Sequence, residues 1–404
     1  MSTVNTGLKS ASVSTSITTM SNTKIYIKKI NKNNYNKNNY KLSSNNNLLS
    51  SNGDPVGLSL DKNCLSSFCH GDKEKKNAFF IEGGGTRGVY AIGILRYLFD
   101  DNKYFNLSQV DIFGGTSVGS YFATALSLGF DKNDIADLSK IINLNSLTDG
   151  DYMFAKTFYR FVTKNYMYDD IGRTDIIKKI LDQKFNNIKQ HLEKNIDNTV
   201  ASIDLTFGHL QILIKLYPKI YKHLVMNAVD LSTSKQIFMT TLDNKFTNIK
   251  IYDALLASSS IPFVFKPVIL YYDPLLDTYS YTYSTNFTEN TLVDGAVSTG
   301  NPLDYFLLKD KIINDYELWL LKFTHEPIYT KINSTYSLFK QLVEYLISGK
   351  NEIKTKLIED LYPINIINLY STNGVLDIYT PQQVQEISID IYQKCINGDL
   401  YFNN

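Results

Sequence analysis

The chain is poor in the residues that mark several common classes of protein. It has three cysteines among 404 residues, Cys64, Cys69 and Cys395. Because their number is odd and they lack the spacing of a zinc site, we expect reduced thiols of an intracellular protein and no disulfide framework. Cys64, Cys69 and His70 lie close together in sequence, but no second ligand pair follows, so a metal is not expected.

Long apolar runs and a strong charge imbalance are also missing. No stretch approaches the roughly 18 uninterrupted apolar residues of a membrane span. The first residues, MSTVNTGLKSASVSTS, lack the apolar core of a signal peptide. The formal net charge is +1, which gives no reason to expect nucleic acid as a partner. These absences predict a cytoplasmic protein without signal peptide or transmembrane segment, whose contact with membranes is peripheral.

Residues 1–76 form a tract rich in Ser, Asn and Lys, with the sequence NKNNY repeated at 31–35 and 36–40. Such a composition cannot bury enough apolar area to offset the loss of chain entropy on folding. We therefore expect a mostly disordered tail. A second interpretation is that its basic, tyrosine-containing part binds RNA or an anionic surface.

Regular structure is expected from residue 77 onwards. A buried strand (Asn77–Glu82), a glycine turn and a helix (Val89–Phe99) are followed by a second strand, VDIFG, and a second helix (Val118–Leu128) that Gly129 closes. Strands that alternate with helices in this way predict an α/β fold, with a parallel sheet covered by helices on both faces.

The remainder of the chain is less regular. Residues 131–222 are expected to be mostly helical. Further strands are expected at 222–231, 235–242 and 317–323. Within residues 271–290, tyrosine alternates with small polar residues, which predicts one strand of a hairpin. Residues 326–404 are expected to be a mainly helical extension packed on the same domain.

The first candidate functional element is the loop between the first strand and its helix, which reads Gly83, Gly84, Gly85, Thr86, Arg87 and Gly88. Glycines let backbone N–H groups approach an anion, and the helix N-terminus adds partial positive charge. The loop therefore suits a phosphate or the oxyanion of acyl transfer, and a plain tight turn stays open. A dinucleotide site is disfavoured, because it requires an acid at the end of the second strand, whereas Asp111 lies at its start.

The second element is a serine between two glycines, in the sequence Gly115, Thr116, Ser117, Val118 and Gly119. Flanking glycines permit a strained strand-to-helix turn that presents the hydroxyl at the carboxyl end of the sheet. This pattern also occurs by chance. Its position between a strand and a helix favours a reactive serine over a structural one.

The third element is Asp294, followed by Gly295 and Ala296 at the end of another expected strand. An aspartate before a glycine is more often a turn residue than a base. Its weight as a candidate base comes from the two elements before it.

The order of these motifs resembles that of the patatin-like phospholipases. GGGTRG is followed by GTSVG after about one helix and one strand, then by ASSSIPFVFKP (Ala257–Pro267), by DGA, and by GNP (Gly300–Pro302). LTFGHL and NAVDLSTSKQIF are also similar to elements of the bacterial-type members. The resemblance covers roughly residues 77–325.

The resemblance implies a three-layer α/β/α domain with a mostly parallel central sheet and lipid acyl hydrolase activity on phospholipid or other acyl-ester lipids. It implies a dyad of Ser117 as nucleophile and Asp294 as proton acceptor, with no cofactor or metal. The backbone of Gly83, Gly84 and Gly85 would form the oxyanion hole. The supporting motif residues would be Thr86, Arg87, Gly88, Gly115, Gly119, Gly295 and Ala296.

Four points go beyond the motif series. Glu82 before the glycines and the tyrosine-rich hairpin at 271–290 depart from the family pattern. Arg87 either steers a phosphate headgroup or caps carbonyls of its own loop. The helical residues 131–222 are expected to supply a partial lid.

Two alternatives stay open at this point. An α/β-hydrolase with a triad of Ser117, Asp294 and His325 has the required chain order. However, the glycine loop lies only 32 residues before the serine, and the neighbours of His325 match no motif. A non-catalytic protein that uses this fold to bind a partner or a membrane is the second alternative. The need for an activating protein partner is not decided by the sequence.

Overall fold

The computed structural model describes ten segments of the chain. They are residues 24–28, 75–100, 105–148, 154–192, 200–307, 315–325, 329–349, 362–371, 374–398 and 400–402. Within them, no helix has both the length and the apolar character needed to cross a bilayer.

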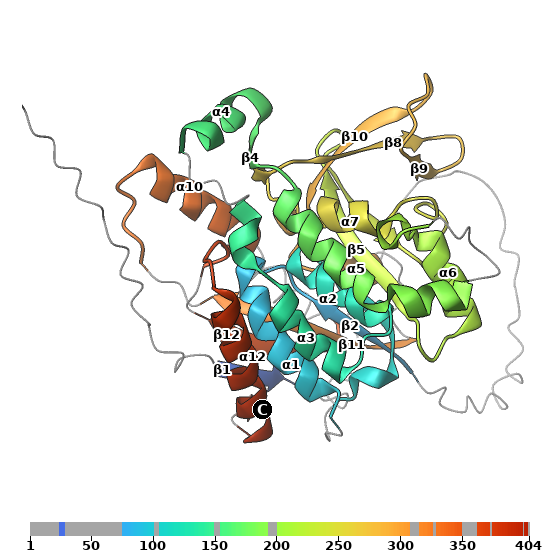
Figure 1. The fold of residues 1–404 in the computed structure, drawn as a ribbon, viewed down its shortest axis with the longest axis vertical. Coiled ribbons are helices and arrows are strands. Elements are labelled where there is room, and N and C mark those ends of the chain that lie inside the picture. Colours follow the sequence, from blue (N-terminus) through green and yellow to red (C-terminus); the bar gives the residue numbers. More distant parts are fainter. Residues whose placement is uncertain are drawn as a thin grey trace, which may run out of the picture.

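A twisted sheet with five adjacent parallel strands at its centre forms the middle of the molecule (Figure 1). In spatial order these strands are β12 (Ile364–Ser371), β11 (Tyr316–His325), β2 (Lys76–Ile81), β3 (Val110–Gly115) and β5 (His223–Asp230). Parallel strands have their carboxyl ends at one edge of the sheet, so the loops after β2 and β3 lie side by side.

Antiparallel strands extend the sheet on both sides. Beyond β5 lie β10 (Thr288–Asp294), β8 (Val268–Asp273) and β9 (Thr278–Ser280), and β6 (Lys235–Thr240) also pairs with β5. At the other side β1 (Lys24–Lys28) lies between β12 and β13 (Leu400–Phe402).

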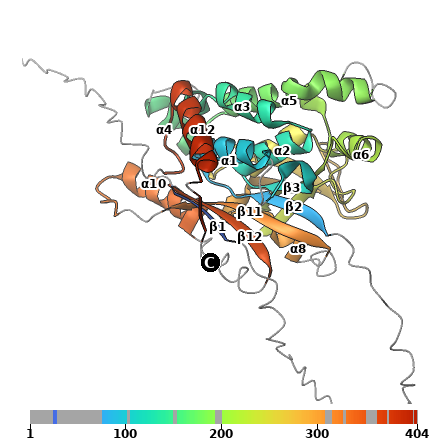
Figure 2. The ribbon, with the colours of Figure 1, turned by 90° about the horizontal axis from the view of Figure 1, so that it is seen from below.

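Helices cover both faces of the sheet (Figure 2). One face carries α1 (Val89–Leu98), α2 (Val118–Ser127), α3 (Lys132–Ile141), α5 (Ile171–Leu192), α6 (Phe207–Leu216), α7 (Ile251–Ser258) and α12 (Pro381–Ile396). The other face carries α8 (Asp304–Leu307). Side chains of β2 alternate between these layers, since Phe79 and Ile81 enter the larger core and Ala78 and Phe80 the smaller one. The expected three-layer α/β/α arrangement is confirmed.

A third, smaller cluster lies beside the carboxyl ends of the parallel strands. It joins α10 (Thr335–Glu344) to β7 (Phe263–Phe265), which pairs with β4 (Tyr166–Tyr168). The amphipathic helix α4 (Phe154–Lys164) contacts both, because the ring of Phe161 lies 6.1 Å from that of Phe263 and 6.4 Å from that of Phe339.

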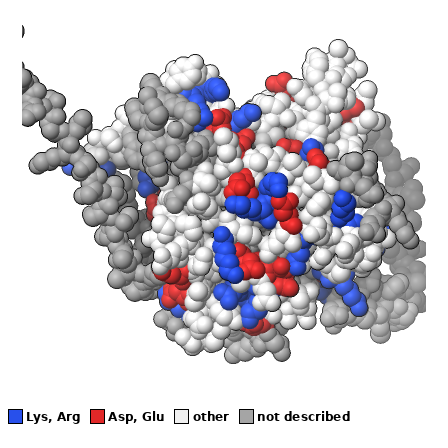
Figure 3. Space-filling view, viewed as in Figure 1, with Lys and Arg blue, Asp and Glu red and all other residues white. Residues whose placement is uncertain are grey.

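Charged side chains of both signs are interspersed on the face shown in Figure 3. Among the described residues several ion pairs lie within one helix, such as Lys178 with Asp182 and Lys179 with Asp175 on α5. Neither sign forms a continuous patch there. This pattern agrees with the near-neutral net charge and gives no reason to expect a nucleic-acid surface on this face.

Three regions differ in part from what the sequence predicts. Lys24–Lys28 lies within the predicted disordered tail but forms β1, in which Ile25 is only 1% exposed; the rest of residues 1–74 lies outside the described segments. In the described part of 326–404 helices make up most of the regular structure, but the stretch also supplies β12, which enters the sheet between β11 and β1 and was not expected. In the tyrosine-rich stretch β9 forms the expected hairpin with β8, but of the alternating Tyr279, Tyr281 and Tyr283 only Tyr279 lies in it. The Tyr281 hydroxyl instead donates to Asp253 at 2.7 Å.

Candidate active site

The strand register brings the serine and the aspartate to the same level of the sheet. Gly115 at the end of β3 pairs with Met226 of β5, and Asp294 at the end of β10 lies opposite Ala228. Ser117 follows Gly115 by two residues, as Ala228 follows Met226. Ser117 and Asp294 therefore flank the same end of β5, although 177 residues separate them in sequence.

Ser117 lies on a strained turn between β3 and α2. Its φ is +52°, a region that non-glycine residues rarely adopt, and its side chain is 3% exposed. The turn is this tight because α2 begins directly against the strands: a Cβ atom on Gly119 would lie 2.2 Å from the carbonyl oxygen of Ile81. The N–H of Ser117 donates to the hydroxyl of Ser258 at 3.1 Å, which holds the turn.

Asp294 is completely buried at the start of a 3₁₀ turn, Gly295–Val297. Its Oδ1 accepts the N–H of Ala296 at 2.8 Å, whereas Oδ2 is buried without a conventional hydrogen-bond partner among the described residues. Burial raises the pKa of Asp294 to about 7, and the Ala296 N–H, the Ser117 hydroxyl and the Arg173 guanidinium lower it in part. A carboxyl with such a pKa can take up and release a proton near neutral pH.

The glycine loop meets the other two elements at Gly83. A Cβ atom on Gly83 would lie within 3.4 Å of the Cβ atoms of both Ser117 and Ala296. The three sequence motifs thus converge on one point.

The N–H groups of the glycine loop are not equivalent. Gly83 donates to the carbonyl of Gly300 at 2.7 Å, so the expectation that all three glycines offer free donors is wrong for Gly83. Gly84 and Gly85 make no N–H hydrogen bond within the described residues, and neither does Val118 at the first turn of α2. Sequence reasoning missed Val118, which follows the serine directly and lies beside it along the pocket.

Arg87 caps its own loop. Its side chain is 1% exposed, Nε donates to the carbonyl of Gly84 at 3.2 Å, and Nη2 pairs with Glu344 at 3.2 Å. Burial lowers the pKa of Arg87, and the carboxylates of Glu344 and Glu82 oppose that effect. Of the two interpretations of Arg87, the structure therefore agrees with the loop cap.

Glu82 is a buried carboxyl on the other side of the same loop. Its Oε2 accepts the N–H of Phe323 at 3.0 Å. Burial raises the pKa of Glu82 to about 7, opposed by Lys322, by that N–H and by Arg87. Its contact joins the end of β2 to β11, which is a structural role.

An apolar cavity of about 100 Å³ opens beside Ser117. Its walls come from α2, α3, α5 and the segment that follows α7. The apolar lining includes Phe122, Leu138, Leu144, Ile176, Ile180 and Phe265. Several of these residues belong to the stretch 131–222 that was expected to supply a lid; in the structure they form a wall of the cavity.

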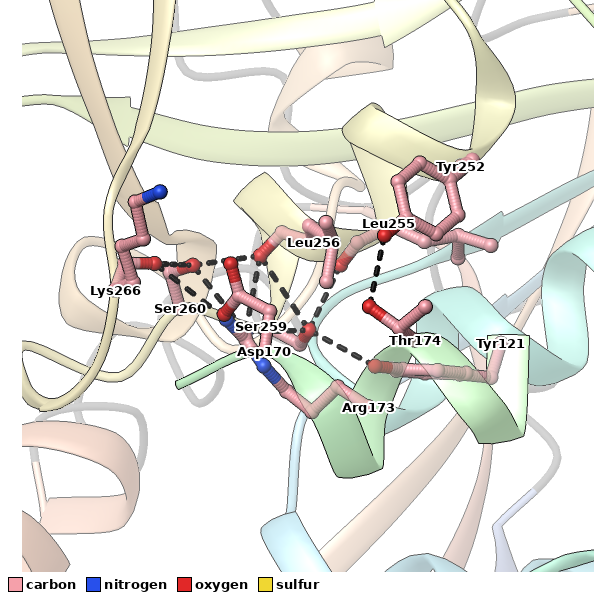
Figure 4. A network of polar contacts seen from close by, with 10 residues as sticks. All are labelled: Tyr121, Asp170, Arg173, Thr174, Tyr252, Leu255, Leu256, Ser259, Ser260 and Lys266. Carbon is pink, nitrogen blue, oxygen red and sulfur yellow. Dashed lines mark hydrogen bonds and ion pairs between the residues drawn. The ribbon is translucent and has the colours of Figure 1, made fainter. Parts of the chain in front are cut away.

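Arg173 of α5 is the one charged residue that lines this cavity within the described segments. Nη1 donates to the carbonyl of Leu256 and to the hydroxyls of Ser259 and Ser260, each at 3.2 Å (Figure 4). Nη2 pairs with Asp170, and the guanidinium lies 4.4 Å from the ring centre of Phe265.

This network reaches the aspartate through the backbone, because the carbonyl of Ser260 accepts the N–H of Asp294 at 2.9 Å. The serines of ASSSIP thus have defined contacts: Ser258 holds the turn of Ser117, and Ser259 and Ser260 bind Arg173. Sequence reasoning quoted this motif without assigning contacts to it.

The sheet topology separates His325 from the other members of the alternative triad. His325 is the last residue of β11, and three strands, β2, β3 and β5, lie between β11 and β10. At the usual strand spacing its backbone is about 19 Å from that of Asp294. His191, His209 and His223 hydrogen-bond Tyr221, Thr206 and Thr241 instead. His70 lies outside the described segments.

A serine on a strained strand-to-helix turn, beside a buried carboxyl and a glycine loop, defines an α/β protein with a hydrolase-like site. The chain belongs to the patatin-like phospholipase family, whose profile matches residues 79–307. Its fold is the patatin-like fold.

Two mimivirus proteins are similar in sequence. Uncharacterized protein L620 of Acanthamoeba polyphaga mimivirus is 45% identical over 336 residues, which covers 82% of this chain and 90% of that protein. Uncharacterized protein R571 of the same virus is 25% identical over 230 residues, covering 56% and 70%.

Two solved structures also match. VipD from Legionella pneumophila has 15% identity and a TM-score of 0.42, over 80% of this chain and 66% of that one. The type III effector ExoU, from Pseudomonas aeruginosa, has 15% identity and a TM-score of 0.37, over 81% and 53%. The chain thus spans just under two thirds of VipD and about half of ExoU.

Proposed function

We propose that the chain is a serine-dependent lipid acyl hydrolase that cleaves carboxylic ester bonds through Ser117 and Asp294. The observation that carries the proposal is the placement of Ser117, on a strained turn, next to a buried Asp294 whose pKa is about 7. A serine hydroxyl needs a base to become a nucleophile, and a carboxyl with a pKa near the working pH can serve as one.

In the proposed reaction the Asp294 carboxylate takes the proton of Ser117 as the hydroxyl attacks the ester carbonyl. The N–H groups of Gly84, Gly85 and Val118 are the proposed oxyanion donors, because no described residue occupies them. Protonated Asp294 then gives its proton to the leaving alcohol. Water hydrolyses the acyl-enzyme with Asp294 again as base. No step requires a metal or cofactor.

The proposed substrate is a phospholipid or another lipid with an acyl ester. The cavity beside Ser117 supports this class, because its walls are almost entirely aliphatic and aromatic. Such a cavity suits an acyl chain and offers few partners to a polar acyl group. The headgroup and the position of the cleaved ester are not specified by these contacts.

Access from a lipid surface is part of the proposal. Tyr159 and Val162 of α4 are 65% and 60% exposed. Leu338 and Leu342 on α10, and Tyr345 directly after it, are each about half exposed. The opposite side of α10 packs into the cluster that borders the cavity. A helix that is apolar on both sides is typical of one whose outer side meets an apolar partner. We propose peripheral contact there by a cytoplasmic protein.

A fluorophosphonate probe tests the proposed nucleophile. The purified protein should gain one covalent adduct, located on Ser117 by mass spectrometry, and the Ser117→Ala variant should gain none. Products from a panel of phospholipids and neutral esters, identified by mass, would define the substrate. Absence of both labelling and hydrolysis would favour the alternative of a non-catalytic binding protein.

A further inference from the structure

The last residue of α10, Glu344, connects the C-terminal part of the chain to the glycine loop. Its Oε1 accepts from Nη2 of Arg87 at 3.2 Å, and its Oε2 accepts the N–H of Val375 at 2.9 Å. Both oxygens of one carboxylate are thus used, and the side chain is 13% exposed. Glu344 and Val375 lie outside residues 79–307 that match the family profile.

The two partners of Glu344, Arg87 and Val375, each hydrogen-bond a different part of the glycine loop. Arg87 donates through Nε to the carbonyl of Gly84 at 3.2 Å. The carbonyl oxygen of Val375 accepts two hydrogen bonds from Thr86, one from its N–H at 3.0 Å and one from its hydroxyl at 3.3 Å. These five residues, which we call the Glu344 clamp, form a closed chain of contacts around Gly85.

Gly85 packs directly against the backbone of Val375. Its φ is +57°, and a Cβ atom there would lie 2.1 Å from the carbonyl oxygen of Val375. The Gly84 carbonyl and the Gly85 N–H share one peptide plane, which the bond from Arg87 holds, and the Thr86 N–H holds the next plane. The N–H group of Gly85 itself makes no hydrogen bond among the described residues.

We propose that Glu344 is a positioning residue that orients the N–H group of Gly85 through Arg87 and Val375. The inference rests on the proposed function, in which this N–H group is one of those that bind the oxyanion. Glu344 does not contact the reacting atoms. It balances the charge of a buried guanidinium and fixes the loop before the reaction starts, which is where preorganised donors gain their effect.

The test compares Glu344→Gln with the wild type on a soluble short-chain ester. Glutamine keeps the shape but has one acceptor oxygen, so it cannot accept from both Arg87 and Val375. Removing one oxyanion donor costs roughly 100- to 1000-fold in kcat. Misplacing the Gly85 donor without removing it should cost about 10- to 100-fold in kcat, with KM changed by less than about twofold, because the donor acts mainly on the transition state.

Lys340→Met is the matched control. Lys340 lies on the same helix and pairs with Asp377 at 3.1 Å, two residues from Val375, but it does not contact the glycine loop. Its kcat should stay within about twofold of the wild-type value. Should Glu344→Gln not fold, Glu344→Asp carries the same comparison, because it keeps the charge and withdraws the carboxylate by one methylene.

Hydrogen–deuterium exchange gives a readout that does not depend on activity. The peptide covering residues 82–88 should exchange faster in Glu344→Gln than in the wild type or in Lys340→Met. If the wild type shows no Ser117-dependent hydrolysis, the proposed function fails and the exchange result still decides the clamp. Unchanged exchange at 82–88, unchanged kcat in an active protein, or an equal loss of kcat in Lys340→Met would overturn it.

Discussion

Replacing Asp294 with asparagine should make the protein more stable at alkaline pH while abolishing its activity. Burial raises the pKa of Asp294 from 3.8 to about 7. Between these two pH values the carboxyl is therefore ionised in the unfolded state but still mostly protonated in the folded state. The contribution of this group to the free energy of unfolding is fully present below pH 3.8, and it is lost as the pH rises to about 7. At about 1.4 kcal/mol per pH unit, the ionised form costs the folded state about 4 kcal/mol above pH 7.

Asparagine removes this cost and retains the acceptor for the Ala296 N–H. Between pH 5 and pH 9 the stability advantage of Asp294→Asn over the wild type should grow by about 3 kcal/mol. The free energy of unfolding of both proteins, from urea titrations at a series of pH values, measures it. Glu82 also has a raised pKa, but it is present in both proteins and cancels. A difference that is constant with pH, or that favours the wild type at pH 9, would refute the reasoning.

Further predictions follow from the same contacts. The value of kcat/KM for a soluble ester should rise with pH around a midpoint of about 7, since Asp294 must be ionised to act as a base. Arg173→Met should move that midpoint upward, because the guanidinium lowers the pKa of Asp294. Ile25→Asp should lower the free energy of unfolding by about 3 kcal/mol, since it places a charge at a side chain 1% exposed; an unchanged value would show that β1 contributes nothing. Leu342→Asp should reduce hydrolysis of lipid vesicles at least about fivefold and spare a soluble ester, whereas Ile389→Asp on α12 should affect neither.

Local sequence patterns were sufficient for four of the five parallel strands and for the three motif loops, but not for β12, which lies in the stretch expected to be helical. Hydrophobic periodicity and flanking glycines, which extend over only a few residues, mark each of these elements. They are the strand and helix after residue 77, the turn of Ser117 and the strand before Asp294. Because parallel strands end at one edge of the sheet, convergence of the glycine loop and the Ser117 turn could be predicted without knowing the strand order. The position of Asp294 could not be predicted in this way, because β10 runs antiparallel to β5.

Long-range pairing was not predictable in the same way. The strand β1 is five residues long within a Ser- and Asn-rich tract, and its partners β12 and β13 lie more than 330 residues away. The Glu344 clamp joins residues more than 250 positions apart, and nothing in the sequence around Glu344 marks it. Whether the Gly83 N–H is free depends on Gly300, which reaches it through the tertiary fold.

The central claim is that Asp294, without a histidine, serves as the base for Ser117. Initial rates on one short-chain ester, for Ser117→Ala, Asp294→Asn and His325→Ala, test it most directly, with circular dichroism to confirm folding. We expect Ser117→Ala and Asp294→Asn each to lose essentially all hydrolysis, and His325→Ala to keep most of it, because His325 lies four strand positions from β10. Loss in His325→Ala equal to that in Ser117→Ala would contradict the dyad and favour the triad.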